Sequence, residues 1–498
     1  MENQPSCTTE CGNNRSATIQ PLVVEELLQS EIEKGYLWGP FEKSPFEIYR
    51  ISPIGIAEGK YSKKKRLIVD LSAPYDNENI PSINDLIDKD LHSLSYVTVD
   101  DAIELIKKAG AGALLSKFDI SDAFKLIPLK PEIWHLFGIK WKNLYYFYKR
   151  LAFGCRSSPK IFDQLSVAIC WIAMNNYKVD NIIHLLDDFL TVDDASEKGY
   201  RTMAILSMIF KKLRIPLSVK KTVGPVTELE YLGIILDSVN MIARLPADKV
   251  QRLKEMLNKY SKMKSCTKVK LLSLLGHMSF ASKVVVPGRS FMSYLLKLIR
   301  GKNNNHDIVF FNDDCRKDMK MWMTFLQNWN GVSFFIDSVV TNDDIELYTD
   351  ASSTKGFGGY FAGKWFQDTW PDELSMNVNN DKSLSMALLE LYPIVMSAIL
   401  WGSQWTKKRI IFRCDNLSCV YILRKGRSPC SNIMLLMRRL TWCAATNNFS
   451  FYAEHVRSQD NGISDSLSRF QMLRFRQLAP LAEEKPVPCV PYQEVIYP

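Results

Sequence analysis

Residues 185–194 read LLDDFLTVDD and hold two pairs of adjacent aspartates, Asp187–Asp188 and Asp193–Asp194. Adjacent carboxylates repel each other, so each pair requires either the solvent of a turn or a bound cation. Apolar residues flank the first pair on both sides, with IIHLL before it and FLTV after it. This pattern predicts a β-hairpin that carries Asp187 and Asp188 at its bend.

The second pair ends the predicted strand and precedes an amphipathic helix expected at 194–215. An aspartate at such a position caps free amide groups and meets the positive end of the helix dipole. Capping therefore accounts for Asp193 and Asp194 but leaves Asp187 and Asp188 without a structural role. Metal binding is the better interpretation of the first pair, although hairpin turns also carry aspartates routinely.

A third carboxylate strengthens the metal hypothesis. Asp119, in the segment SKFDISDAF, lies at the end of an apolar strand, where an unpaired acid is costly unless a cation meets it. Three carboxylates offer about the oxygen ligation that two Mg²⁺ ions need when phosphates supply the rest. Such ions would activate a 3′-hydroxyl and neutralise a leaving pyrophosphate.

The composition indicates a large globular protein. The chain has 498 residues, of which 46% are hydrophobic and 11% are aromatic. This length exceeds what a single hydrophobic core usually holds, so we expect roughly two to four domains. The net charge of +9 is spread over basic runs such as 63–66 and 407–409, which fit either solvated helix faces or a polyanionic partner. The 11 cysteines lie mostly within apolar stretches, as expected of free thiols in a reducing compartment.

We expect an intracellular protein, cytoplasmic or nuclear, without a membrane partner. The N-terminal sequence MENQPSCTTECGNN has no hydrophobic stretch of the signal-peptide kind. No apolar run approaches the length of about 20 residues that a membrane helix needs. The run KKKR at 63–66 is compatible with nuclear localisation but is better explained as a loop between two strands.

Four segments resemble, in order and approximate spacing, the palm motifs of retroelement reverse transcriptases: SKFDISDAF, LAFGCRSSPKIFDQL, LLDDFL and LEYLGI. The upstream segment RLIVDLS is similar to the fingers strand of the same enzymes. SPIGIAEG and SLLGHMSFASKVVVPGRSF are similar to the DIRS-like, tyrosine-recombinase retrotransposons. The resemblance covers about residues 30–470. It implies a multidomain α/β and α+β chain, a right-hand polymerase of fingers, palm and thumb followed by a ribonuclease H-like mixed-sheet domain.

The resemblance implies metal ligands in the palm. Asp119 and Asp187 would ligate two Mg²⁺ or Mn²⁺ ions, and Asp188 would support them. The chain departs from many reverse transcriptases at Leu185 and Leu186, where a tyrosine heads the motif. Neither departure removes a metal ligand.

The resemblance also implies residues that bind the dNTP substrate. Phe124 would lie under the incoming sugar and exclude a 2′-hydroxyl, and Arg66 would contact the nucleotide phosphates. Gly154 would let template or nucleotide approach the backbone. Lys221, or its neighbour Lys220, would donate a proton to pyrophosphate. Each residue has an ordinary alternative: a core aromatic, a charge in a basic loop, a turn glycine or a solvated lysine. Phe153 stands where some retroviral enzymes carry glutamine.

The C-terminal third holds four further acids. Asp350 ends a strand in IELYTDASS, Glu390 lies inside the apolar helix SMALLELYPIVMSAIL, Asp415 closes the strand RIIFRCDN and Asp465 falls in the short helix NGISDSLSR. Alone, each acid fits a turn, a helix surface, a strand end or a cap. Together, in order and placement, they resemble ribonuclease H.

That resemblance implies two more Mg²⁺ ions astride a scissile phosphate. His455, ten residues before Asp465, matches a mobile histidine that assists product departure in this family, although a surface loop histidine is the alternative. Lysine-rich helices at about 245–300 would grip an A-like duplex by its backbone. The expected parts are a disordered N-terminus (1–20), fingers and palm (21–240), thumb (241–300), connection (301–342), ribonuclease H-like domain (343–472) and Pro-rich tail (473–498).

The expected function is RNA-directed DNA synthesis on retroelement RNA with cleavage of the hybrid's RNA strand. The expected partners are an RNA template, a DNA primer, the RNA–DNA hybrid and other retroelement proteins of the recombinase or Gag-like kind. A DNA-templated or pararetroviral polymerase would use the same residues. A domesticated, catalytically idle protein that binds nucleic acid is the non-enzyme alternative. Retention of all seven acids favours an enzyme, since a relic without catalytic selection would lose some of them.

Overall fold

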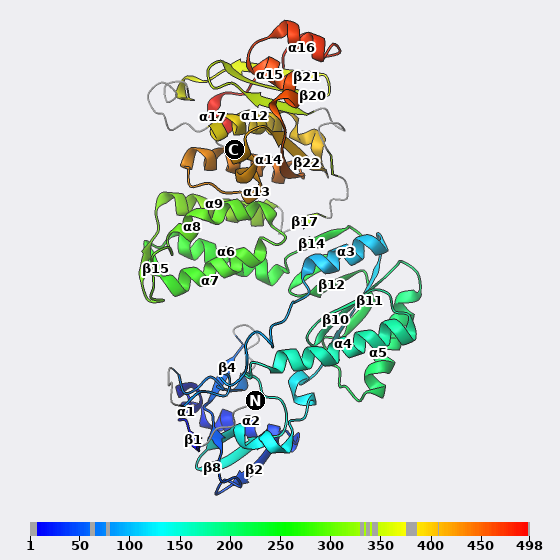
Figure 1. Ribbon diagram of the computed structural model, residues 1–498, viewed down its shortest axis with the longest axis vertical. Helices are drawn as coiled ribbons and strands as arrows, with labels where there is room; N and C mark the ends of the chain where they lie inside the picture. The colour runs from blue at the N-terminus through cyan, green and yellow to red at the C-terminus, as the bar shows by residue number, and fades with distance from the viewer. Residues whose placement is uncertain are drawn as a thin grey trace. The chain divides into compact units, whose positions relative to one another are not determined.

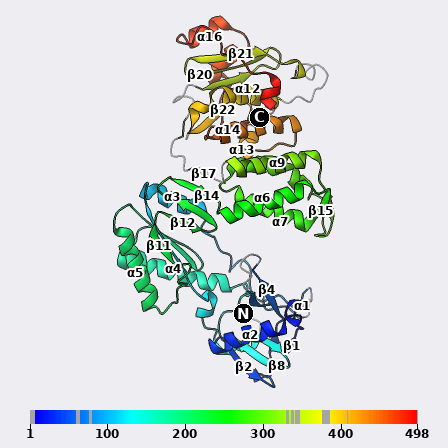
Figure 2. The same cartoon turned by 180° about the vertical axis from the view of Figure 1, so that it is seen from behind.

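The computed structural model describes residues 7–59, 65–75, 80–328, 333–334, 339–340, 347–374, 386–406 and 408–496. The chain divides into two compact units (Figures 1 and 2). The first unit is Met1–Leu232 with Asp237–Asn240, and the second is Gly233–Leu236 with Met241–Pro498. Each unit mixes helices and sheets, so the protein is a multidomain α/β chain.

The N-terminal half of the first unit is built on a five-stranded sheet. Aromatic residues dominate its central hairpin, and Phe147 and Tyr148 are fully buried there. Helix α2 (Pro21–Glu33) packs on this sheet and on the hairpin of β4 (Ile54–Glu58) and β5 (Lys65–Val69). The strand order is β1 (Thr9–Glu10), β3 (Arg50–Ile51), β7 (Gly138–Trp141), β8 (Leu144–Tyr148) and β2 (Leu37–Phe41).

The second half of this unit is a four-stranded antiparallel sheet with helices packed against it. Its strand order is β11 (Val223–Val226), β6 (Leu114–Asp119), β10 (Asp188–Asp193) and β9 (Ile182–Leu185). The helices are α3 (Val99–Ala109), α4 (Ser158–Tyr177) and α5 (Lys198–Lys212), and β12 (Glu228–Tyr231) follows. Thr98 and Asp101 form a capping box at the start of α3, which ends before Gly110 as expected. The short 3₁₀ helices η1 (Ala123–Leu126) and η2 (Pro131–Leu136) connect the two halves.

The N-terminal segment is more ordered than its composition suggests. Disorder was expected over 1–20, and this prediction is wrong for 7–20, which contain β1 and α1 (Arg15–Thr18). Thr9 and Cys11 donate their backbone N–H groups to the carbonyls of Tyr49 (3.1 Å) and Ile51 (3.0 Å). A segment with few apolar residues is thus ordered by adding to a sheet edge, because backbone hydrogen bonds do not depend on side-chain hydrophobicity. Residues 1–6 lie outside the described residues.

The second unit begins with a helical region. Its main helices are amphipathic and bury leucine-rich faces against one another. They are α6 (Ala247–Ser261), α7 (Lys268–Ala281), α8 (Ser293–Lys297) and α9 (Asp313–Asn328), with η3 (Val286–Met292) between α7 and α8. The strands of this region are β13 (Ile234–Asp237), β14 (Ile242–Arg244), β15 (Ser265–Thr267), β16 (Ile308–Phe310) and β17 (Ser333–Phe334).

The C-terminal region places helices on two three-stranded sheets. One sheet is antiparallel and contains β19 (Tyr348–Ala351), β20 (Gly356–Phe361) and β21 (Lys364–Thr369); the other is parallel and contains β18 (Val339–Val340), β22 (Arg409–Cys414) and β23 (Ser450–His455). The helices are α12 (Met386–Trp401), η4 (Gly402–Trp405), α13 (Leu417–Lys425), α14 (Ser431–Thr446), η5 (Ser458–Asn461), α15 (Gly462–Ser468), α16 (Met472–Leu478) and α17 (Tyr492–Ile496).

Helix α12 is the central core helix of this region. Together with η4 it forms a 20-residue segment, Met386–Trp405, that is long and apolar enough to cross a membrane. The expectation that no apolar run reaches this length is therefore wrong. The segment is 78% buried, and its side chains pack in one core with β20, β22 and α14, so core burial accounts for its composition.

The segment 473–498 was expected as a tail, but its described residues are packed: Val495 lies in the core around α12, and Phe475 lies in a smaller cluster with Tyr360 and Trp365. Phe475 and Val495 are completely buried, and Val487 donates its backbone N–H to the carbonyl of Trp365 at 2.7 Å. The high proline content suggested a tail. However, an extended segment that makes backbone hydrogen bonds and carries a few large apolar side chains can pack as well as a helix or a strand. Residues 497–498 lie outside the described chain.

Candidate active sites

Three aspartates meet at one edge of the four-stranded sheet and form what we call the first acidic cluster, Asp119, Asp187 and Asp188. Strand β6 ends at Asp119, strand β10 begins at Asp188, and the two residues are directly paired in the antiparallel register. Asp187 lies in the turn between β9 and β10, and its carbonyl accepts the backbone N–H of Ile120 at 3.0 Å. The hairpin predicted for LLDDFL is confirmed, with the acids at its bend.

Helix α4 holds this hairpin in place. Leu186 adopts a left-handed backbone conformation (φ 53°), which is uncommon for leucine, and its carbonyl accepts a 2.8 Å hydrogen bond from the Ser166 hydroxyl. One turn further along the same helix face, the Cys170 thiol lies 3.4 Å from His184 Nδ1. His184 Nε2 lies 3.2 Å from Asp163 Oδ1. Four polar side chains thus fix the strand and turn that present Asp187 and Asp188.

Burial and like charge make the first cluster costly without a cation. Asp119 is only 4% exposed. Burial raises the pKa of Asp187, and the nearby charge of Asp119 raises it further. Burial also raises the pKa of Asp188, although Lys117 opposes the shift. A divalent cation would relieve both effects, so these residues fit the metal site that the sequence suggested.

Two lysines already contact the cluster. Lys221 Nζ lies 2.8 Å from Asp119 Oδ2, and this hydrogen bond raises the pKa of Lys221. Lys117 Nζ lies 3.4 Å from Asp188 Oδ1. Lys221 was among the predicted residues, whereas Lys117 was missed. It stands two residues before Asp119 on β6, and strand alternation, which places residues i and i+2 on one face, was the available signal. Lys220, the neighbour of Lys221, is exposed.

Phe124 lies in η1, five residues after Asp119, where it borders two hydrophobic cores. Its ring centroid is 5.0 Å from that of Phe153 and 5.6 Å from that of Phe162. Phe162 is fully buried, whereas Phe153 is 42% exposed. The exposed ring of Phe153 therefore extends the aromatic surface that Phe124 begins, a contact that the sequence did not predict.

Strand β5 contains Arg66, and its last residue, Val69, is approached by Gly154. Arg66 is an exposed residue of this strand. Gly154 has φ 96°, and a Cβ at this position would lie 2.5 Å from the carbonyl oxygen of Val69, at the end of the same strand. Only a residue without a Cβ allows this close approach to Val69, which supports the alternative that Gly154 is a turn glycine.

The second pair of aspartates has structural partners. Asp193 Oδ1 accepts the Thr202 hydroxyl at 2.8 Å. Asp194 accepts hydrogen bonds from the Ser196 hydroxyl, from Lys198 Nζ at 2.9 Å and from the backbone N–H of Ser196 at 3.1 Å, and these bonds lower its pKa to about 2. These contacts shape the turn before α5; a direct cap on that helix is not made, because its N-cap residue is Glu197.

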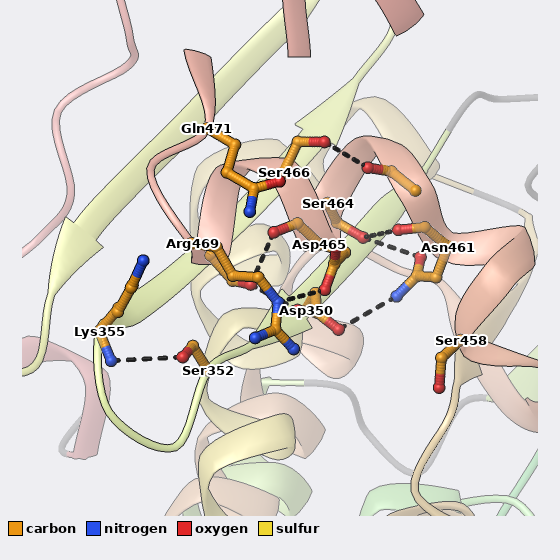
Figure 3. A network of polar contacts seen from close by, with 12 residues as sticks. Asp350, Ser352, Lys355, Ser458, Asn461, Ser464, Asp465, Ser466, Arg469 and Gln471 are labelled. Atoms are coloured by element: carbon orange, nitrogen blue, oxygen red, sulfur yellow. Dashed lines mark hydrogen bonds and ion pairs between the residues drawn. The ribbon is translucent and has the colours of Figure 1, made fainter. Parts of the chain in front are cut away.

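The second acidic cluster consists of Asp350, Glu390, Asp415 and Asp465. Asp350 (β19) is 5% exposed, and its Oδ2 accepts the Ser468 hydroxyl at 2.5 Å while Asn461 donates to Oδ1 at 3.4 Å (Figure 3). Asp415 follows β22 and accepts the Ser458 hydroxyl at 2.8 Å. The parallel pairing of β22 with β23 brings His455 to this edge, where its Nε2 lies 3.2 Å from the Asp415 carbonyl oxygen.

Burial makes the ionised forms of Asp350 and Glu390 unfavourable. Burial raises the pKa of Asp350 to about 6 and that of Glu390, inside α12, to about 11. Ligand atoms of Glu390, Cys414 and Asp415 all lie within 4.8 Å of one another, so divalent cation binding is sterically possible there. Buried carboxylates that resist ionisation fit a site that a cation completes.

Asp465 is held differently. Its carboxylate is exposed enough to pair with two arginines, Arg469 Nε at 2.6 Å and Arg474 Nη1 at 2.8 Å. Figure 3 shows Arg469 and Asp465 beside Asp350. The sequence predicted Asp465 but missed both arginines, although Arg469 follows it by one helical turn. It also missed Ser468 and Asn461, whose short polar side chains carry no distinctive pattern.

Comparisons with known proteins agree with this arrangement. Residues 43–236, which contain the first acidic cluster, match the family model described as reverse transcriptase (RNA-dependent DNA polymerase). The chain carries a reverse transcriptase domain. A comparison with curated protein sequences gave no match.

The whole chain also resembles solved reverse transcriptases. A foamy viral protease-reverse transcriptase in complex with double-stranded DNA aligns with a TM-score of 0.54 and 14% identity, over 91% of this chain and 72% of that one. A second structure of the foamy viral protease-reverse transcriptase with double-stranded DNA gives a TM-score of 0.50 and 15% identity, over 91% and 86% of the two chains. At these identities the likeness shows the fold, which is the reverse transcriptase polymerase fold.

Proposed function

We propose that this protein copies RNA into DNA at the first acidic cluster and cleaves the RNA strand of the resulting hybrid at the second. The observation that carries the polymerase assignment is the placement of Asp119, Asp187 and Asp188 at one sheet edge of the reverse transcriptase domain. The observation that supports the nuclease assignment is the gathering of Asp350, Glu390, Asp415 and Asp465 around one edge of the C-terminal sheets.

In the polymerase site, Asp119 and Asp187 would hold Mg²⁺ or Mn²⁺ with Asp188 in support. Bound ions would activate the primer 3′-hydroxyl and neutralise charge on the leaving pyrophosphate. Lys221 stays protonated beside Asp119, so it can donate its proton once that carboxylate is otherwise engaged. Phe124, five residues after Asp119 and in ring contact with the half-exposed Phe153, would block a 2′-hydroxyl on the incoming nucleotide.

Arg66 would bind the nucleotide phosphates, since a guanidinium offers several donors to one phosphate. Its exposure on β5 leaves it accessible to such a ligand. Gly154 would keep the adjoining loop close to β5, where it approaches Val69. The same glycine would let template or nucleotide approach the backbone, as the resemblance implies.

In the nuclease site, the four acids would hold two Mg²⁺ ions. Those ions would position water and stabilise the leaving oxygen of the scissile phosphate. Arg469 and Arg474 neutralise Asp465. The ring of His455 contacts the Asp415 carbonyl and is exposed, and it would accompany the product out of the site.

The proposed organisation keeps fingers and palm within 21–240, a thumb at 241–300, a connection at 301–342 and the nuclease from 343 onward, extended through 473–496 by the packed C-terminal helices. The basic thumb helices would contact the duplex backbone. The segments SPIGIAEG and SLLGHMSFASKVVVPGRSF support an origin in a DIRS-like retroelement.

One assay tests both activities. A DNA primer is annealed to an RNA template, each with a different label, and incubated with dNTPs and Mg²⁺. The proposal expects the primer to lengthen and the RNA to shorten behind it. Primer extension without RNA cleavage would refute the nuclease assignment alone, and cleavage without extension would refute the polymerase assignment.

A further inference from the structure

Lys125, the residue directly after Phe124, is a buried lysine. It is 4% exposed, and burial lowers its pKa, which the charges of Glu31 and Asp122 partly offset. Burial of an unpaired ammonium group costs free energy, so the partners of Lys125 are informative about its role. Its Nζ lies 3.0 Å from Glu31 Oε2 and 3.8 Å from the ring centroid of Tyr148. One partner is on α2 and the other on β8.

The other end of η1 is attached to the same part of the fold. Asp122 precedes η1 with a left-handed backbone (φ 53°), and its carbonyl accepts the Lys125 N–H at 2.8 Å. Its carboxylate Oδ2 accepts Lys34 Nζ at 2.8 Å and the Tyr36 hydroxyl at 3.2 Å. Lys34 and Tyr36 follow the end of α2 that carries Glu31. Residues 122 and 125 are therefore both anchored to one turn of the N-terminal half of the unit.

Phe124 lies between these two anchors. Because η1 spans only four residues, its own hydrogen bonds do little to fix its orientation. Phe124 contacts Phe153 and Phe162 through ring edges and faces, which tolerate sliding. The side chain of Arg150 donates to the Leu126 carbonyl at the end of η1 (3.2 Å), and the side chains of Asp122 and Lys125 make the directional contacts on either side of Phe124.

We propose that Lys125 is a positioning residue for nucleotide selection: by tying η1 to Glu31 and the Tyr148 ring, it sets the place of Phe124 and with it the discrimination against ribonucleotides. The inference rests on the proposed polymerase function. An apolar side chain would fill the same space but would not specify a partner, whereas a buried ion pair with one carboxylate does.

The test compares Lys125→Met with the wild-type protein. Methionine keeps the length and apolar contact of the stem and removes the ammonium group. We expect the ratio of dNTP to rNTP incorporation efficiency to fall by about tenfold, through a higher KM for dNTP and more efficient rNTP use, because sub-ångström displacement of a positioning group has effects of this size or larger. Lys125→Arg retains the charge and is expected to restore most of the ratio.

The matched control is Lys142→Met. Lys142 pairs with Glu25 of the same helix α2 at 2.6 Å, but from the β7–β8 turn, away from η1. This variant is expected to keep the wild-type ratio. The variant Phe124→Val is compared with Phe124→Val/Lys125→Met, and loss of Lys125 is expected to change selectivity no further once the ring is gone.

These measurements distinguish failure of the positioning role of Lys125 from failure of the proposed polymerase function. DNA synthesis by Lys125→Met with an unchanged sugar ratio overturns the positioning role. If loss of Lys125 lowers the dNTP-to-rNTP ratio equally with and without the Phe124 ring, the positioning role is also overturned, because Lys125 would then act through another residue. If the wild-type protein makes no DNA, the proposed function fails and the inference fails with it.

Discussion

Asp188 lies directly across from Asp119 in the antiparallel ladder between β10 and β6. Paired residues in such a ladder have Cβ atoms about 5 Å apart, so two carboxylates in this register repel each other. Lys117 and Lys221 relieve part of this repulsion, and Leu186 with its left-handed backbone directs Asp187 to the same edge. This repulsion lowers the stability of the metal-free protein, and the proposed cations would relieve it.

The Asp465→Asn variant should separate the two activities. Asp465 lies in the second unit, so its replacement leaves the first acidic cluster unchanged and DNA synthesis nearly intact. Hybrid cleavage should fall by about 100-fold or more, since loss of one preorganised charged group in a catalytic site typically costs this much. Asp460→Asn, an exposed acid in η5 nearby, is the control and should retain cleavage. Loss of both activities in Asp465→Asn would contradict the two-site account.

Glu390→Gln should stabilise the metal-free protein at neutral pH. The pKa of Glu390 is raised to about 11 by burial, from 4.5, so the folded state holds a proton that the unfolded state releases. Stability contributed by this group is therefore fully present below pH 4.5 and declines as the pH rises towards 11. Over the roughly 2.5 pH units up to pH 7, at about 1.36 kcal/mol per unit, the gain in the free energy of unfolding is at most about 3 kcal/mol.

Urea unfolding of the two proteins in EDTA at pH 5 and pH 7 measures this effect. The advantage of Glu390→Gln should shrink at pH 5, and added Mg²⁺ should stabilise the wild-type protein more than the variant. Glu484→Gln, a fully exposed position, should show no difference at either pH. An advantage that is absent at pH 7 or grows at pH 5 would show that burial does not keep Glu390 protonated.

Phe124→Ala should admit ribonucleotides. If the ring excludes the 2′-hydroxyl as proposed, its removal should raise the efficiency of rNTP incorporation by at least about tenfold relative to dNTP. Phe162→Leu is the control, because Phe162 contacts Phe124 from the buried side. It should cost stability without changing sugar selection. Single-nucleotide incorporation kinetics measure both, and unchanged discrimination in Phe124→Ala would remove this ring from the sugar site.

Ser166→Ala should slow synthesis without weakening binding of the primer–template. The variant removes the donor to the Leu186 carbonyl, which costs about 1–2 kcal/mol of stability and loosens the turn that carries Asp187. The kcat for nucleotide addition should fall by about tenfold. Ser207→Ala, on the exposed face of α5, should leave kcat unchanged. A wild-type kcat in Ser166→Ala would mean that the turn keeps its geometry without this bond.

The sequence could predict the first acidic cluster because its information is local. Apolar runs define β6 and β10, and Asp119 and Asp187 stand where those runs end, so a sheet brings them together. Lys117 was not predicted, because a single lysine in a strand reads as a solvent-facing residue until its neighbour is known.

Local sequence patterns could not predict contacts between segments that lie far apart in the chain. Glu31 and Lys125 are 94 positions apart, and nothing in either segment marks the other as its partner. Order at 7–20 and at the C-terminal end also depends on long-range contacts: the backbone of Thr9 adds to β3, and Val495 enters the core around α12. Composition describes how a segment behaves alone, and these segments are stabilised by what they pack against.

The most direct test of the central claim is extension of a DNA primer on an RNA template with Mg²⁺ or Mn²⁺, comparing the wild-type protein with Asp187→Asn/Asp188→Asn. The matched control is Asp193→Asn/Asp194→Asn, which removes the same charge from the pair that shapes the turn before α5. We predict synthesis by the wild-type and control proteins and none by Asp187→Asn/Asp188→Asn. Absence of synthesis by folded wild-type protein that binds the primer–template, or synthesis that survives in Asp187→Asn/Asp188→Asn, would contradict the account.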